Sequence, residues 1–231
     1  MPSRTQPVLW IATRNRGKTR EFSQLLRGIC QVRDLHGLPR FPEIRENGKT
    51  FAANAQIKAQ ALSRVLLDRP ILADDSGLVV PALGGRPGVY SARFSGPQAT
   101  DQSNRTKLLK LLAAKSGISR RAYFEACLVI SQNGAVVSSV SGRIWGRITT
   151  QEMGKGGFGY DSIFQPNRFS KTFGQLPANT KHRISHRARA VAKLKTRLSK
   201  ILSVSRSKKS IEYNIYCATN KEYLLLCLGG L

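Results

Sequence analysis

The chain has 231 residues, with 38 Lys and Arg against 13 Asp and Glu, which gives a formal net charge of +25. Hydrophobic residues make up 41% of the chain and are spread along it, which excludes a wholly disordered protein and predicts a buried core. The charge favours phosphorylated or polyanionic partners. No acid occurs from Ser162 to Ile211, so much of the excess lies in one region, which is either a polyanion surface or a solvated basic face.

The four cysteines show neither the CxxC spacing of a zinc site nor the density of a disulfide scaffold, so they suit a reducing compartment. The apolar run at residues 8–12 is too short for the core of a signal peptide. The run at residues 223–228 is too short to cross a bilayer, which needs about 20 apolar residues. We therefore expect a cytoplasmic protein without membrane insertion.

Strands and helices alternate in the first part of the predicted structure. Residues 8–12 are predicted to form a buried strand, followed by a polar loop at residues 13–18 and a helix. A helical pattern covers residues 51–66, with Asn54 and Lys58 one turn apart beside its apolar stripe. Residues 71–73 are predicted to be a short strand, which places Asp74 and Asp75 where the strand becomes a loop.

The second part is predicted to contain paired strands and a long helix. Residues 84–96 are rich in Gly and Pro and indicate an ordered loop, and residues 108–112 indicate a helix. Two β-rich stretches, 122–130 and 135–148, flank an Asn-Gly turn signal and predict an antiparallel hairpin. An amphipathic helix is expected over residues 184–201, with Ser185 as its N-cap. We expect one α/β domain over residues 1–200, followed by a basic linker and C-terminal extension of unknown structure at residues 201–231.

The tandem carboxylates Asp74 and Asp75 have two interpretations. Mg²⁺ prefers a few carboxylate oxygens together with water and phosphate, and a strand end with two acids provides such oxygens. The sequence Asp-Asp-Ser-Gly also makes a good turn, and by itself the turn is favoured. Glu46, beside an Asn-Gly turn, is a candidate third donor or a solvated loop carboxylate.

The segment Thr13 to Lys18 lies between a predicted strand and a predicted helix. Free backbone N–H groups and the positive helix end favour phosphate at such a place. The spacing is not that of a Walker loop, because no glycine stands at position 12. A capped helix start with exposed basic residues is the alternative.

Two later segments carry groups that could recognise a nucleotide. The sequence GGFGYD (156–161) combines flexible backbone with aromatic rings that can stack on a base, or it forms a buried aromatic turn. Lys181, His186 and Arg187 stand at the start of the last helix, where they either reach an anion or base or form a basic helix face. His182 and His186 have metal-pair spacing, but no third ligand is evident.

Taken in order, six segments resemble the Ham1-type inosine/xanthosine triphosphate pyrophosphatase family. They are TRNRGK (13–18), ENGKTFAANAQIKA (46–59), LADDSGL (72–78), LGGRPGVYSARFSG (83–96), GGFGYD (156–161) and ISHRARA (184–190). The resemblance runs from about residue 8 to residue 198. It implies an elongated two-lobed α/β fold with a central mixed sheet flanked by helices, an active-site cleft between the lobes, and a homodimer. It also implies hydrolysis of the purine triphosphates ITP, dITP and XTP to the monophosphate and pyrophosphate, with Mg²⁺ as cofactor.

The resemblance also implies roles for individual residues. Asp75 would be the catalytic acidic residue, which activates water and helps to bind the metal, and Glu46 its metal partner. Substrate-binding roles fall on Thr13, Arg14, Asn15, Arg16, Gly17, Lys18, Lys58, Ser76, Phe158, Gly159, Tyr160, Asp161, Lys181, His186 and Arg187. The chain departs from the family pattern in three places: Arg14 stands where Gly is usual, Arg45 stands where an acid is frequent, and Asn179-Thr180 replaces an acidic pair.

Two other functions compete with this one. The charge and the acid-free region favour a nucleic-acid-binding protein, but aromatic residues are sparse there and no nucleic-acid-binding motif occurs, so a stable nucleic-acid complex is not expected. A related house-cleaning hydrolase for modified pyrimidine or methylated nucleotides would share the same general architecture.

Overall fold

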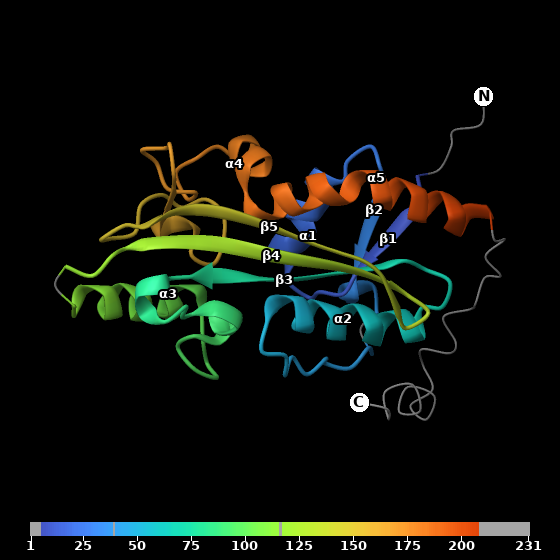
Figure 1. Cartoon of the computed structure of the whole chain (residues 1–231), viewed down its shortest axis with the longest axis horizontal. Helices are drawn as coiled ribbons and strands as arrows, with labels where there is room; N and C mark the ends of the chain where they lie inside the picture. Colours follow the sequence, from blue (N-terminus) through green and yellow to red (C-terminus); the bar gives the residue numbers. More distant parts are fainter. Residues whose placement is uncertain (1–5, 39, 116, 208–231) are drawn as a thin grey trace. The chain divides into compact units, whose positions relative to one another are not determined.

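The computed structural model describes residues 6–38, 40–115 and 117–207, which contain a six-stranded mixed sheet flanked by helices (Figure 1). The strand order is β2-β1-β3-β4-β5-β6. The strands are β1 (Val8–Ile11), β2 (Gln31–Asp34), β3 (Ile71–Val79), β4 (Arg121–Gln132), β5 (Ala135–Ile148) and β6 (Phe164–Pro166). β1 pairs in parallel with β2 and β3, whereas β5 and β6 are antiparallel. The predicted α/β class with a central mixed sheet is confirmed.

The chain forms two compact units, as the prediction of two lobes requires. The first takes in the described residues up to Asp75, together with Cys127–Val140 and those from Val191 onward. The second takes in Ser76–Ala126 and Ser141–Ala190. The cleft expected from the family resemblance stays a prediction.

The first unit contains β1, β2, α1 (Arg16–Leu25), α2 (Phe51–Val65) and the C-terminal part of α5 (His186–Ser207). Side-chain caps begin the first two helices: Asn15 accepts a hydrogen bond from the Lys18 backbone N–H, and Thr50 accepts one from Ala53. α2 and the later turns of α5 lie on opposite sides of the unit's strands (Figure 1). Its buried apolar residues include Leu9, Ile11, Phe22, Leu26, Ala55, Leu62, Leu72, Leu128, Leu194 and Leu198.

The tip of the β4–β5 hairpin belongs to the first unit and confirms the predicted Asn-Gly turn. Asn133 and Gly134 have φ angles of 51° and 77°, the pair of positive values that a two-residue type I′ turn requires. α2 holds the turn, because Gln60 Nε2 donates to Gly134 O at 2.9 Å and Ser63 Oγ accepts from Gly134 N at 3.0 Å.

The second unit contains α3 (Asp101–Ala113), α4 (Ala178–Ile184), β6 and the strand ends nearest to them. Thr100 and Ser103 form a capping box at the start of α3. The core is aromatic: the rings of Phe124 and Phe164 lie 4.7 Å apart, and those of Phe164 and Phe173 lie 5.4 Å apart. This core supports the loop that follows β5.

Several elements differ from their predicted bounds. β3 is longer than residues 71–73, and α3 begins before residue 108. The glycine-rich stretch 84–96 contains a 3₁₀ helix at Gly88–Arg93, so it is more regular than predicted. The short strands β2 and β6 and the helix α4 were not predicted.

The last predicted helix is divided at Ser185. α4 ends at Ile184, and α5 begins at His186 with Ser185 Oγ accepting from Ala188 N at 3.2 Å, which confirms the N-cap. α5 continues to Ser207 and buries Leu202, so the predicted boundary at residue 200 falls inside a helix. The rest of the predicted extension, residues 208–231, lies outside the described residues.

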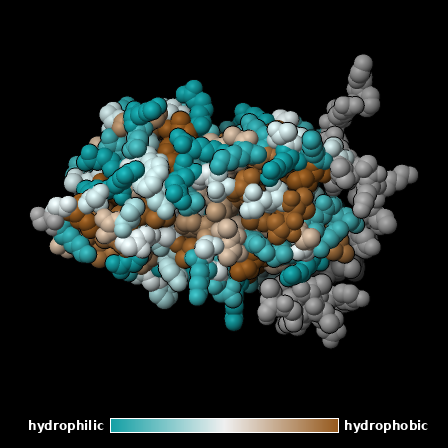
Figure 2. Space-filling view, in the orientation of Figure 1, coloured by the Kyte–Doolittle hydropathy of each residue, from teal (hydrophilic) through white to brown (hydrophobic). Residues whose placement is uncertain are grey.

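Hydrophilic side chains cover much of the displayed face, with hydrophobic areas between them (Figure 2). The large hydrophobic side chains exposed among the described residues are Leu67, Tyr90, Val136 and Val137. No helix in the described part of the chain combines the length and apolar character needed to cross a bilayer.

Candidate functional site

Asp74 and Asp75 lie inside β3, not at its end. The predicted loop position is wrong, because β3 continues to Val79. Successive side chains of a strand point to opposite faces, so the two carboxylates do not share a site. Asp74 contacts Lys18, whose Nζ lies 3.0 Å from its Oδ2 and also donates to its backbone O. Asp75 contacts a different lysine.

The carboxylate cluster of the first unit consists of Glu46, Asn54, Lys58 and Asp75. Asn54 and Lys58 lie one turn apart on α2 and are both buried, as the predicted stripe requires. Lys58 Nζ lies 2.9 Å from Glu46 Oε2 and 3.0 Å from Asp75 Oδ1. Asn54 Nδ2 donates to Asp75 Oδ2 at 3.3 Å. One buried ammonium is thus shared by two carboxylates.

The two carboxyl groups of the cluster have opposite pKa shifts. Burial raises the pKa of Asp75, and the charge of Glu46 adds to this, although Lys58 and Lys18 oppose it. Burial would also raise the pKa of Glu46, but the charge and hydrogen bond of Lys58 outweigh burial and lower it. Burial disfavours the charged form of Lys58, yet the two carboxylates raise its pKa, so the lysine stays charged. Asp75 is therefore the group of this cluster that accepts a proton most readily.

The loop at residues 13–18 joins β1 to α1, as predicted. Thr13 Oγ1 accepts from Asn15 N at 3.1 Å, and the N-cap at Asn15 fixes the helix start. Arg14 turns towards backbone carbonyls, donating to Leu35 O and Phe41 O. The side chain of Arg16 is exposed, and Gly17 and Lys18 are half-buried in the first turn. Arg45, another departure from the family pattern, is exposed beside the half-buried Glu46.

The aromatic cluster of the second unit consists of Ser76, Phe158, Asp161, Lys181 and Arg187. Asp161 Oδ2 accepts from Lys181 Nζ at 2.6 Å and from Phe158 N at 2.9 Å. The Phe158 ring has Lys181 Nζ at 4.9 Å and Arg187 Cζ at 5.3 Å from its centroid. Arg187 also donates to Ser76 Oγ at 2.6 Å. The half-buried ring thus lies close to two cations.

Two glycines permit this arrangement. Gly157 has a φ angle of 78°, and a Cβ there would meet Asp161 Oδ2 at 2.0 Å. On β5, a Cβ at Gly142 would meet His186 O at 2.2 Å and Ala190 N at 2.4 Å. The first turn of α5 can therefore lie directly on the strand, which places His186 and Arg187.

The remaining residues of the GGFGYD segment are held by other elements. Gly159 N donates to Asp101 Oδ2 at 2.7 Å, and Gly159 O accepts from Arg105 Nη1 at 2.8 Å, so α3 fixes the loop. Tyr160 is buried in the core, and its hydroxyl donates to Ser91 O at 2.8 Å. Burial raises the pKa of Tyr160. The structure thus gives Tyr160 a packing role.

His186 lies in the interior of the second unit. It is 3% exposed, and its ring stacks on Phe124 with centroids 4.8 Å apart. His182, four residues earlier, lies on α4 and is half-buried. In the described part of the chain, no three His, Cys, Asp or Glu side chains form a metal-holding group.

The donors of the carboxylate cluster nevertheless suit one kind of metal. Glu46 and Asp75 approach the same ammonium group, and the Glu46 side chain is 30% exposed. Mg²⁺ is commonly bound by one or two carboxylates while water and substrate phosphates complete its coordination. A pair of carboxylates with one accessible member fits that mode and does not fit a closed site made only of protein ligands.

Sequence reasoning missed four residues that position these clusters. Asn54 was placed on the correct stripe but not assigned to the site; its signal is a polar residue one turn from a lysine in an apolar helix. Asp101 and Arg105 support the GGFGYD segment, and Phe124 supports His186. These last three depend on contacts between distant segments, for which the sequence has no local signal.

Comparisons with known proteins find similarity over most of the chain. A family model described as the Ham1 family matches residues 9–197. A dITP/XTP pyrophosphatase of Geobacter sulfurreducens is 44% identical over 191 residues, which cover 82% of this chain and 96% of the relative. A protein of the same name from Geobacillus kaustophilus is 46% identical over 186 residues, covering 80% and 90%. The solved structure of a HAM1 protein from Coxiella burnetii matches with a TM-score of 0.75 and 35% identity, over 84% of this chain and 100% of the other.

Proposed function

The chain belongs to the Ham1 family, and on this premise we propose that it hydrolyses the damaged purine nucleoside triphosphates ITP, dITP and XTP to the monophosphate and pyrophosphate. The names of the relatives support the reaction and the substrate class. The observation that carries the proposal for this chain is the carboxylate cluster. It combines a buried carboxyl group of raised pKa with a charged lysine and a second, accessible carboxylate.

In this proposal Asp75 is the catalytic residue. A carboxylate oxygen of Asp75 orients a water molecule and accepts its proton while the water oxygen attacks the α-phosphorus. The bond between the α-phosphorus and the bridging oxygen breaks, so pyrophosphate leaves. The raised pKa of Asp75 brings the carboxyl group closer to the working pH than an ordinary aspartate.

Glu46 and Asp75 would hold Mg²⁺ as cofactor, and the bound ion supplies positive charge that polarises the phosphorus centre. Lys58 keeps the two carboxylates together from the protein side. Lys18 and the N–H groups of the 13–18 loop bind phosphate oxygens, because a helix N-terminus carries partial positive charge. Lys18 leaves or shares its contact with Asp74 in doing so.

We assign the aromatic cluster to the purine base. The Phe158 ring offers a stacking face, and Arg187 beside it can donate to the 6-oxo group. Arg187 is a better candidate donor than His186, whose ring stacks on Phe124. A 6-amino group would leave such a donor unpaired, at a cost of about 1–3 kcal/mol. This difference would separate dITP from dATP.

A substrate panel tests the proposal. Pyrophosphate release is measured with ITP, dITP, XTP, ATP, dATP and dUTP, each in Mg²⁺ and again with EDTA in excess. We expect turnover of the 6-oxo purines alone, and loss of that turnover in EDTA. Preference for dUTP would assign the chain to another house-cleaning reaction, and no turnover of any triphosphate would contradict the proposal.

The homodimer, the cytoplasmic location and the absence of a stable nucleic-acid complex, all expected from the sequence, stay predictions. Light scattering after size-exclusion chromatography would determine whether the chain forms a homodimer.

A further inference from the structure

The β4–β5 hairpin in the second unit has one face towards the core and one towards solvent. Even-numbered residues face inward: Phe124 packs on Phe164 and His186, and Ile144 and Ile148 are buried. Alternation along a strand sends the odd-numbered residues to the other face. The outer face is therefore separated by the strands themselves from the face that contacts His186.

On the outer face, cross-strand side-chain pairs recur every two residues along β4 and β5. Glu125 pairs with Arg143 at 2.9 Å, and the rings of Tyr123 and Trp145 lie 4.5 Å apart. The next step along both strands brings Arg121 and Arg147 opposite each other, as the hydrogen bond from Ile148 N to Arg120 O requires. Like charges directly opposite each other destabilise a strand pair.

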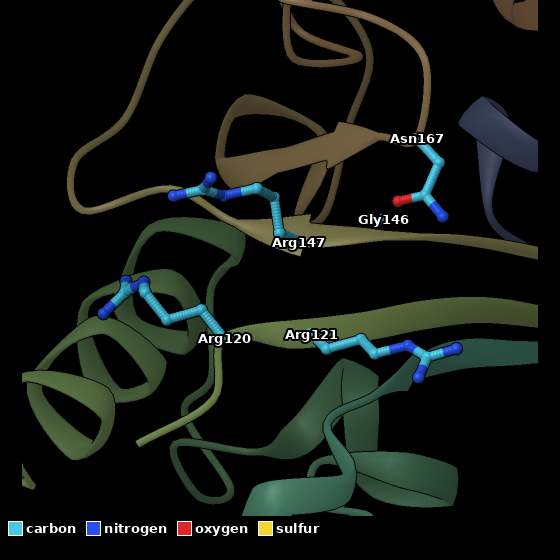
Figure 3. Close-up of a pocket in the computed structure, with 5 residues that line it drawn as sticks. All are labelled: Arg120, Arg121, Gly146, Arg147 and Asn167. Atoms are coloured by element: carbon cyan, nitrogen blue, oxygen red, sulfur yellow. The ribbon is translucent and has the colours of Figure 1, made fainter. Parts of the chain in front are cut away.

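Three arginines border a cavity of about 360 Å³ at this open end of the hairpin, namely Arg120, Arg121 and Arg147, with Gly146 and Asn167 completing the lining. Arg120 and Arg147 extend the same way from neighbouring strands, whereas Arg121 extends the opposite way, towards Trp145 (Figure 3). Burial lowers the pKa of Arg120, and the charge of Arg147 adds to this. The cavity thus lies among mutually repelling cations.

None of the three arginines forms an ion pair with an acid of the described residues. Arg120 donates to the carbonyls of Ile148 and Thr149, which fixes its stem at the ends of the strands. Arg121 stacks on Trp145 with Cζ 4.3 Å from the ring centroid. Arg120 and Arg121 are therefore held in place by these contacts, while no acid of the described residues pairs with any of the three guanidinium groups.

We propose that this arginine pocket binds a small phosphate-bearing anion. Guanidinium groups match phosphate oxygens with paired, charge-assisted hydrogen bonds. An anion between Arg120 and Arg147 converts their repulsion into two attractions, whereas Asn167 lies at the other side of the lining, apart from these two guanidinium groups (Figure 3). None of these residues belongs to the carboxylate cluster or the aromatic cluster.

The surroundings favour a small anion over larger partners. A nucleic-acid strand leaving the pocket along the outer face would meet Tyr123 and Trp145 and then the carboxylate of Glu125. A second copy of the chain would bring its own arginines against the same surface. A cavity of this size accommodates a group such as pyrophosphate with its water.

Calorimetric titration of the whole chain with inorganic pyrophosphate, in EDTA and low salt, tests the pocket. Arg147→Gln is the informative variant, because the side chain of Arg147 makes no hydrogen bond within the described residues, and its backbone pairing with Gln165 is kept in the variant. We expect wild type to show a binding event that Arg147→Gln weakens at least tenfold, as loss of a charge-assisted contact to phosphate implies. Arg147→Lys should recover part of it, and dITP turnover should be unchanged in both variants.

Lys171→Gln is the matched control, since it removes one exposed positive charge from the same unit away from the pocket. Lys171→Gln should bind pyrophosphate as the wild-type chain does. An Arg147→Gln isotherm equal to that of wild type would overturn the proposal. The proposal would also be overturned if Arg147→Gln lost binding to a labelled dT10 oligonucleotide while its pyrophosphate binding stayed unchanged, because nucleic acid would then be the occupant. Conversion of a dimer to a monomer by Arg147→Gln would overturn it as well, because a second copy of the chain would then be the occupant.

Discussion

The carboxylate cluster and the aromatic cluster both bury a lysine against an acid, but their charges have opposite sign. In the first, Glu46 and Asp75 share Lys58, so two negative charges and one positive charge leave −1. In the second, Asp161 pairs with Lys181, and Arg187 lies over the Phe158 ring of the same cluster, so one negative and two positive charges leave +1. The comparison indicates that the first cluster is suited to a metal cation and a proton, and the second to an electron-rich oxo group.

Among the substitutions that test this comparison, Asp75→Asn should have the largest effect on catalysis. The amide keeps the shape and the contact with Asn54 but removes the proton acceptor, so kcat for dITP should fall by about 10²–10⁴-fold. Steady-state pyrophosphate release measures the loss, and circular dichroism should show an unchanged fold. Glu43→Gln, which neutralises an exposed acid, is the control and should keep full activity. Turnover of Asp75→Asn at the wild-type rate would remove this residue from the mechanism.

Lys58→Met tests whether the lysine compensates the two carboxylates. Removing one partner from a buried ionic group leaves uncompensated charge, and typical costs are about 3–5 kcal/mol of the free energy of unfolding. Urea denaturation at pH 7 measures this change. Lys49→Met, an exposed lysine of the same unit, should change stability much less. If both variants lose the same amount, Lys58 does not hold the cluster together.

Phe158→Leu tests the aromatic cluster. A leucine stays apolar but cannot stack, and loss of about 1–3 kcal/mol of base stacking corresponds to a rise in KM of about 5–150-fold. We expect kcat for dITP to stay near its wild-type value, in contrast to Asp75→Asn. Phe169→Leu, a half-buried phenylalanine of the same unit, is the matched control. A fall in kcat with KM unchanged would contradict a role in base binding.

Much of the fold follows from local patterns in the sequence. The buried strand at residues 8–12, the apolar stripe of α2 and the Asn133-Gly134 turn depend on neighbouring residues, and the structure confirms all three. β2 and β6 were missed because they are short edge strands, and the exposure of β2 alternates without a fully buried residue. Such strands are defined by the partner to which they bond.

The candidate site was predictable in its residues but not in its pairings. Asp74 and Asp75 were assigned to a loop because charged residues usually end a buried strand. In the structure β3 continues through both, since Lys18 from α1 pairs with Asp74 and Lys58 from α2 pairs with Asp75. Tyr160 lies in the core although its neighbours Phe158 and Asp161 form the cluster. These outcomes depend on which helix faces which side of the strand.

Cys30 provides the last and smallest test, because it is a buried titratable group whose shift comes from burial alone. Burial raises the pKa of its thiol from 9.0 to about 11. The thiolate is the reactive form, so iodoacetamide at pH 8 should alkylate Cys30 far more slowly in the folded chain than in urea, as peptide mass mapping would show. Between about pH 9 and pH 11 the unfolded chain loses this proton more readily than the folded chain, so the contribution of Cys30 to stability falls as pH rises through that window. Equal alkylation rates in the folded and the unfolded chain would show that burial does not suppress the thiolate of Cys30.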